Sequence, residues 1–147
     1  MKISLLKAIL LTSFTLFVST VNSQTSFIKD AEAAKQISQQ VAQDFKENKI
    51  SEAFNRIRKY WPLPENEINI LETQTVSSLN LISDRYGRAE SIVKVREEGI
   101  KDTGIRETYL LKFENTAIRI IFTYYKNNSG WIINSFKWDS DFDEEFR

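Results

Sequence analysis

Two glutamates, two tyrosines and one asparagine in the second half of the chain could together form a small-molecule site: Glu97, Glu107, Tyr109, Tyr124 and Asn134. A carboxylate accepts hydrogen bonds and protons, and a phenol donates them, so such groups could bind a polar ligand or move a proton. They can meet only if neighbouring strands place them on one face of a sheet. Their interpretation therefore depends on the elements that carry them.

The composition excludes several classes of site. The 147 residues include no histidine and no cysteine, which rules out Ser-His-Asp and Cys-His catalysis, disulfides, and zinc held by thiolate or imidazole. The formal net charge is +0, which argues against a surface for nucleic acid. We expect no cofactor and no metal. The length suits one packed domain.

The first 23 residues have the pattern of a secretory signal. Lys2 and Lys7 precede an apolar run over residues 8–18, and small residues follow up to Ser23. The run has about 11 residues, short of the roughly 20 that span a bilayer. We expect cleavage after Ser23, a periplasmic or extracellular location, and one mature domain over residues 24–147 without a membrane span.

Three helices are predicted in the first half of that domain. Apolar residues recur every three or four positions from Phe27 to Phe45, with Ser26 as the expected N-cap. A second helix is predicted over residues 51–61 and ends at a proline. A third is predicted over residues 64–86, and Gly87 fits the stop that follows it.

After Gly87 the apolar period changes from about 3.6 to 2, and turn residues divide the chain into four predicted strands. These strands cover residues 89–101, 105–114, 117–127 and 131–139. The predicted fold class is α+β, with about three N-terminal helices packed on the concave face of a curved four-stranded antiparallel meander.

Pairing the strands across their turns places the apolar residues on one face, in rows across the sheet. The predicted rows are Val93–Phe113–Ile118, Val95–Leu111–Ile120–Trp138, Glu97–Tyr109–Phe122–Phe136 and Gly99–Glu107–Tyr124–Asn134. One end of the face is apolar and the other collects the five polar residues named first. Polar groups at the rim of an apolar hollow are typical of a ligand pocket. The alternative is that the sheet extends past the helices there, leaving the two glutamates in solvent.

The opposite, outer face mixes charged residues with a few apolar ones. Leu110 is expected opposite Ile121, which could form a small apolar patch and a homodimer surface. Scattered apolar residues on a solvated sheet are an equally ordinary explanation.

The order of elements resembles the nuclear transport factor 2-like (cystatin-like) superfamily, in particular small secreted bacterial proteins without an assigned role. The resembling stretches are Trp61–Glu65, Asp84–Gly87, Thr108–Glu114 and Trp131–Asp139. The resemblance implies a cone-shaped fold whose sheet and helices enclose a cavity, which in that superfamily is an active site, a binding pocket, or filled. It carries no catalytic signature onto these residues.

The function expected first is noncatalytic: binding a small apolar or amphipathic ligand, or an envelope protein. A second possibility is a metal-free isomerase or hydratase with Glu97 or Glu107 as base and Tyr109 or Tyr124 as donor, an arrangement that resembles ketosteroid isomerase. The third is a homodimeric structural module with a filled cavity. The absence of histidine, the commonest general base near neutral pH, weighs against an enzyme without excluding one.

Overall fold

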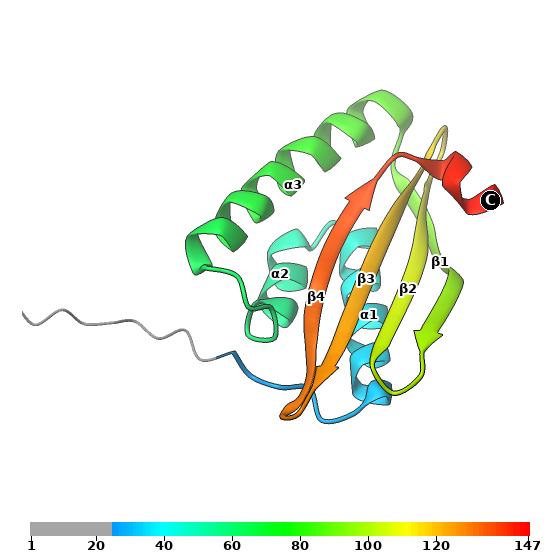
Figure 1. Cartoon of the computed structure of the whole chain (residues 1–147). Coiled ribbons are helices and arrows are strands. Elements are labelled where there is room, and N and C mark those ends of the chain that lie inside the picture. Colours follow the sequence, from blue (N-terminus) through cyan, green and yellow to red (C-terminus); the bar gives the residue numbers. More distant parts are fainter. Residues whose placement is uncertain (1–24) are drawn as a thin grey trace, which may run out of the picture.

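The structure, a computed structural model, describes residues 25–147; the predicted signal segment lies outside the described residues. The elements follow the predicted order (Figure 1). They are α1 (Ala31–Lys46), α2 (Ile50–Arg58), α3 (Glu65–Tyr86), β1 (Ala89–Ile100), β2 (Gly104–Phe113), β3 (Ala117–Asn127), β4 (Gly130–Asp139) and a 3-10 helix, η1 (Phe142–Phe146). Within residues 25–147, none of the helices combines the length and apolar character that crossing a bilayer requires.

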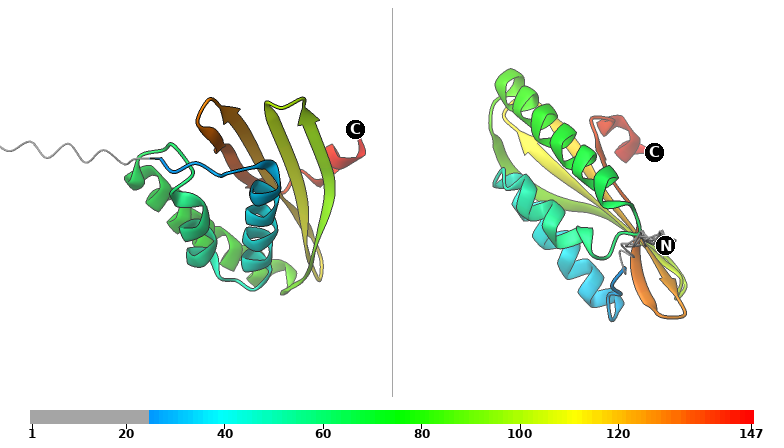
Figure 2. Two further views of the ribbon diagram at one scale, coloured as in Figure 1. Left: turned by 90° about the horizontal axis from the view of Figure 1, so that it is seen from below. Right: turned by 90° about the vertical axis from the view of Figure 1, so that its left-hand side faces the viewer.

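The three α-helices lie on one face of the sheet, and η1 lies on the opposite face (Figure 2). The sheet is antiparallel throughout, with the strand order β1-β2-β3-β4. The α+β prediction, three helices followed by a four-stranded meander, is therefore confirmed.

Two helices begin at residues other than the predicted caps. The side chain of Asp30 accepts a hydrogen bond from the Ala33 amide at 2.7 Å and caps α1. Ser26 lies too early to do so because Ile28 pairs with Trp131 of β4 and holds this segment against the sheet. Helix α2 begins at Ile50 without a side-chain cap. As predicted, α3 ends where Gly87 adopts a φ of +87°.

The pairing register agrees with the prediction over the first half of the β3–β4 pair, up to Thr123, and differs in the second half of that pair and between β2 and β3. Phe122 lies opposite Phe136, as predicted. Leu111, however, lies opposite Ile118 where Ile120 was expected. A shift of two residues leaves each side chain on its predicted face. Phe113, Ile120 and Phe136 consequently share one core, as the predicted rows required.

Strand β1 contains two irregularities that change which residues face the helices. One lies between Lys94 and Arg96. Because a bulge adds one residue, the side chains before it exchange faces. Ile92 and Lys94 face the helices, whereas Val93 is exposed on the outer face and Val95, the extra residue of the irregularity, is also exposed. Their predicted place in the core is wrong.

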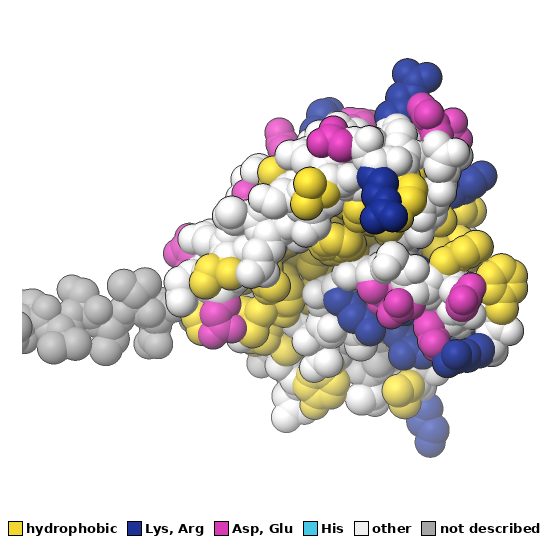
Figure 3. All heavy atoms as spheres, turned by 90° about the horizontal axis from the view of Figure 1, so that it is seen from above, with side chains coloured by type: hydrophobic (Ala, Val, Ile, Leu, Met, Phe, Trp, Pro, Cys, Tyr) yellow, Lys and Arg dark blue, Asp and Glu magenta, His cyan; other side chains and the backbone are white. Residues whose placement is uncertain are grey.

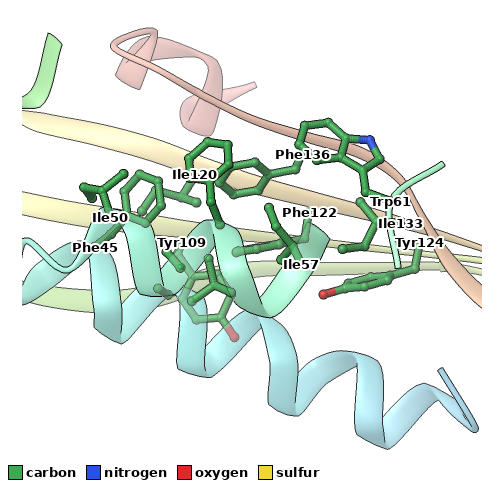
Figure 4. Packing of buried hydrophobic residues seen from close by; sticks show 14 of the residues in the cluster. Phe45, Ile50, Ile57, Trp61, Tyr109, Ile120, Phe122, Tyr124, Ile133 and Phe136 are labelled. Atoms are coloured by element: carbon green, nitrogen blue, oxygen red, sulfur yellow. The ribbon is translucent and has the colours of Figure 1, made fainter. Parts of the chain in front are cut away.

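The core is centred on the ring of Phe136 in β4 (Figure 4). Its centroid lies 5.8 Å from that of Phe45, 5.7 Å from Phe54 and 5.9 Å from Trp61, each edge-to-face. Phe122 of β3 completes the cluster at 5.2 Å. Aromatic pairs in this geometry add to the stabilisation from apolar burial. The space between sheet and helices is thus filled by side chains over most of its length.

Candidate functional site

A cleft of about 620 Å³ opens between α1 and β1. This volume lies within the range of small-molecule sites. Most of its lining is polar, and Tyr109 of β2 and Glu97 of β1, two of the predicted site residues, are part of it. The structure thus places this cleft at the end of the inner face where the sequence predicted polar residues.

Helix α1 supplies one wall because its polar residues recur at helical spacing. The stripe facing β1 consists of Glu32, Lys35, Gln36, Gln39 and Gln43. On the other side of the helix, Ala34, Val41 and Phe45 are buried against the core. The same amphipathic pattern that docks the helix therefore also builds the polar wall.

Two lysines from different elements converge on the carboxylate of Glu97. Lys35 of α1 bonds Oε1, and Lys94 Nζ of β1 lies 2.6 Å from Oε2. The hydrogen bond from Lys35, followed by that from Lys94, lowers the pKa of Glu97 from an ordinary 4.5 to about 2. Glu97 also raises the pKa of Lys94, with Glu107 contributing less. Glu97 and Lys94 are therefore both charged at neutral pH.

Glu107 lies beneath Glu97 and Lys94, and its side chain is fully buried. Its Oε1 accepts a hydrogen bond from Lys94 Nζ at 3.0 Å. Its Oε2 has no hydrogen-bond partner among the described residues. A buried carboxylate oxygen without a donor costs free energy, and most such groups in proteins are paired. The ammonium of Lys94 is therefore the main compensation for this charge.

The two predicted tyrosines lie on the same inner face and differ in whether they are exposed to the cleft. Burial, followed by the charge of Glu107, raises the pKa of Tyr109 to about 12. Burial also raises the pKa of Tyr124, whose hydroxyl lies 2.8 Å from Ser38 Oγ. Both phenols stay protonated at neutral pH. Only Tyr109 lines the cleft, because Tyr124 is sealed beneath α1.

Asn134 does not join the other four predicted residues. The register shifts between Thr123 and Tyr124, and Ile133 takes the inward position opposite Tyr124. Asn134 is exposed as the extra residue of this irregularity. Its predicted place at the cavity mouth is therefore wrong. As for Val93 in β1, the cause is one extra residue in the strand.

The two lysines of the site were not predicted. Lys35 belongs to the polar stripe of α1, and the spacing of the glutamines beside it could have indicated a shared wall. Lys94 was expected on the outer face because it lies between Val93 and Val95, which were both predicted on the inner face. The β1 irregularity that turns it inward has no local signal such as a glycine.

A second, apolar hollow lies along the edge of β4. It measures about 150 Å³ and is lined mainly by Phe54, Trp61, Leu71 and Trp138. In the view from above, hydrophobic side chains follow the furrow between α3 and the sheet, with charged side chains of both signs beside them (Figure 3). This hollow is smaller than the sites that usually hold small molecules.

Residues 25–147 contain no grouping of three acidic side chains that could hold a metal ion. Comparison of the chain with protein-family models, with curated proteins and with solved structures found no match.

Proposed function

We propose that this protein is a secreted, noncatalytic binding domain that holds a small amphipathic ligand in the cleft between α1 and β1. The observation that carries the proposal is the cleft itself, about 620 Å³ in volume and lined by charged, amide and phenol groups. These groups come from three elements and converge on one space, as in many small-molecule sites. Secretion rests on the pattern of the first 23 residues alone.

The lining favours an amphipathic ligand over a wholly apolar one. Ala42 and Ile92 supply a small apolar surface. Lys35, Gln39 and Tyr109 offer hydrogen-bond donors around it. A ligand without polar groups would displace the water bound to these donors and offer no acceptor in its place. Each donor left without a partner costs free energy.

A metal-free isomerase or hydratase is the second candidate. The unpaired Oε2 of Glu107 favours it, because a buried carboxylate near the protonated phenol of Tyr109 could form a proton-transfer pair. Glu97 is a poor base, since two lysines lower its pKa to about 2. Glu107 is covered by Lys94. Binding without catalysis therefore accounts for more of the site.

An envelope protein or a second copy of the chain on the outer sheet face is a further alternative. The apolar patch predicted there is not exposed, because Leu110 and Ile121 are both buried and Leu110 lies opposite Arg119 instead of Ile121. Val93 and Tyr125 are exposed on this face and could contribute to an interface. Sedimentation velocity over a wide concentration range tests for the second copy, and a constant monomer would contradict the homodimer.

The proposal is tested by screening small amphipathic molecules against ¹⁵N-labelled protein by NMR. We expect binders to shift the amide signals of residues 32–43 and 92–97. Gln39→Trp should fill the cleft and weaken such binding about tenfold or more. Gln40→Trp is the matched control, because Gln40 neighbours Gln39 but does not line the cleft. Binders that shift only other regions, or equal effects of the two variants, would contradict the proposal.

A further inference from the structure

The carboxylate of Glu97 stands between two ammonium groups inside the cleft, in the place that a ligand carboxylate could occupy. Lys35 approaches from α1 and Lys94 from β1, and each bonds a different oxygen. Each ammonium carries three N–H donors. Among the described residues Lys35 bonds only Glu97, and Lys94 bonds only Glu97 and Glu107. The pair therefore has donors to spare for another anion.

Glu97 and Glu107 differ in how firmly they are held. The side chain of Glu107 is fully buried and anchors Lys94 from below, whereas that of Glu97 is 37% exposed. A partly exposed side chain can rotate into solvent at little cost, and ion pairs at such exposure contribute little to stability. If Glu97 turned away, Lys94 would stay anchored on Glu107, and Lys35 would lose its hydrogen-bonded anion while Glu32 remains in the same cleft lining.

We infer that the ligand of the cleft carries a carboxylate group, which binds Lys35 and Lys94 in place of Glu97. The inference rests on the proposed binding function and adds the chemical class of the ligand. Glu97 acts as an internal competitor that keeps the two lysines paired when the cleft is empty. The glutamines of α1 and the phenol of Tyr109 then contact the rest of a small organic acid.

A purely structural role for Glu97 leads to a different expectation. In that case the ion pairs would only fasten α1 to β1, and removal of Glu97 would loosen the helix without any gain in anion binding. Competition predicts the opposite, because losing the competitor leaves two lysines for the incoming carboxylate. The sign of the change in affinity separates the two roles.

The test measures binding of butyrate, with butyramide as its uncharged counterpart, by NMR titration of the purified protein. The variants are Glu97→Ala and Glu97→Gln. Glu98→Ala is the matched control, because Glu98 loses the same charge one residue away but pairs with Arg106 on the outer face at 2.7 Å. Dispersed amide spectra show that each variant is folded.

We expect Glu97→Ala and Glu97→Gln to bind butyrate about tenfold tighter than the unaltered protein, equivalent to about 1.4 kcal/mol. Butyramide should gain nothing, Glu98→Ala should behave as the unaltered protein, and adding Lys35→Ala to Glu97→Ala should abolish the gain. No gain, or an equal gain for butyramide or in Glu98→Ala, would overturn the inference. If uncharged molecules still shift the amide signals of the cleft, the proposed binding function stands and only the carboxylate inference fails. If no molecule shifts these signals, the proposed function and the inference both fail.

Discussion

Glu97 and Glu107 lie directly opposite each other on β1 and β2, and both face the helices. Like charges in such a cross-strand pair are destabilising unless a cation separates them. Lys94 supplies that cation, bonding Glu97 Oε2 at 2.6 Å and Glu107 Oε1 at 3.0 Å. The β1 irregularity beside Lys94 is therefore what allows two acids to share this part of the inner face.

Removing the ammonium of Lys94 should destabilise the fold through Glu107. Lys94→Met leaves a buried carboxylate without any partner, and we expect the free energy of unfolding to fall by about 2 kcal/mol, less than for a fully buried pair because Lys94 is partly exposed. Urea denaturation measures the change. Adding Glu107→Gln should restore much of the loss, since the amide carries no charge. A neutral effect of Lys94→Met would contradict this compensation.

The ion pairs of Glu97 should make a defined contribution to the pH dependence of stability. Because the pKa of Glu97 is lowered from 4.5 to about 2 in the folded protein, its ionised form favours folding above about pH 4.5. That contribution is lost as the pH falls from about 4.5 to about 2. The stability difference between the unaltered protein and Glu97→Gln should therefore be constant near neutral pH and shrink over this interval.

Urea unfolding of both proteins at a series of pH values measures this difference. Other acids with lowered pKa values, such as Glu98 and Asp139, are present in both proteins and cancel. A difference that stays constant down to pH 2 would show that Glu97 does not form these pairs in solution.

Glu107 should also affect the titration of Tyr109. The pKa of Tyr109 is raised to about 12, first by burial and then by the negative charge of Glu107. Glu107→Gln removes that charge, so the pKa of Tyr109 should fall while staying above 10. The ¹³C chemical shift of the ring carbon bearing the hydroxyl follows the titration, and Tyr109→Phe identifies the signal. An unchanged pKa would mean that the carboxylate is protonated or distant.

The sequence predicted the strand order and most of the inner face because these depend on turn residues and on alternation. A register shift of two, as at Leu111 and Ile118, preserves the face of every side chain. The tight turn expected at Asn115 and Thr116 lies one residue earlier, where the Phe113 amide bonds the Thr116 carbonyl at 2.8 Å, and the Asn115 amide bonds the Tyr86 carbonyl at 3.0 Å. Contacts between distant segments cannot be read from local turn chemistry.

The site itself was predicted only in part, because strand irregularities decide which residues face inward. Four of the five predicted residues lie on the inner face, as expected: Glu97, Glu107, Tyr109 and Tyr124. Glu97 comes after the β1 irregularity in the chain, and the other three belong to the regularly paired part of β2 and β3. Asn134 is exposed as the extra residue of its irregularity in β4. One inserted residue changes the face of a strand segment without any signature in composition.

The last prediction concerns η1, whose ion pairs to the sheet, among the described residues, are all made by the carboxylate of Glu145. Glu145 lies 2.9 Å from Arg119 Nη1 and 3.3 Å from Arg96 Nη2, and its side chain is largely buried. Glu145→Ala should release η1 and lower the free energy of unfolding by about 1 kcal/mol, because Arg119 keeps a second partner in Asp139. Amide hydrogen exchange at Phe142 and Glu144 should accelerate.

Glu144→Ala is the matched control for this change, because among residues 25–147 the carboxylate of Glu144 pairs only with the exposed Arg147. It should leave both the stability and the exchange rates close to those of the unaltered protein. High salt should weaken the Arg96–Glu145 pair, in which Arg96 is partly exposed, more than the largely buried Arg119–Glu145 pair, so most of the difference between the two variants should persist. Equal effects of Glu144→Ala and Glu145→Ala would mean that η1 is held by its aromatic side chains, and Phe142→Ala would then release it instead.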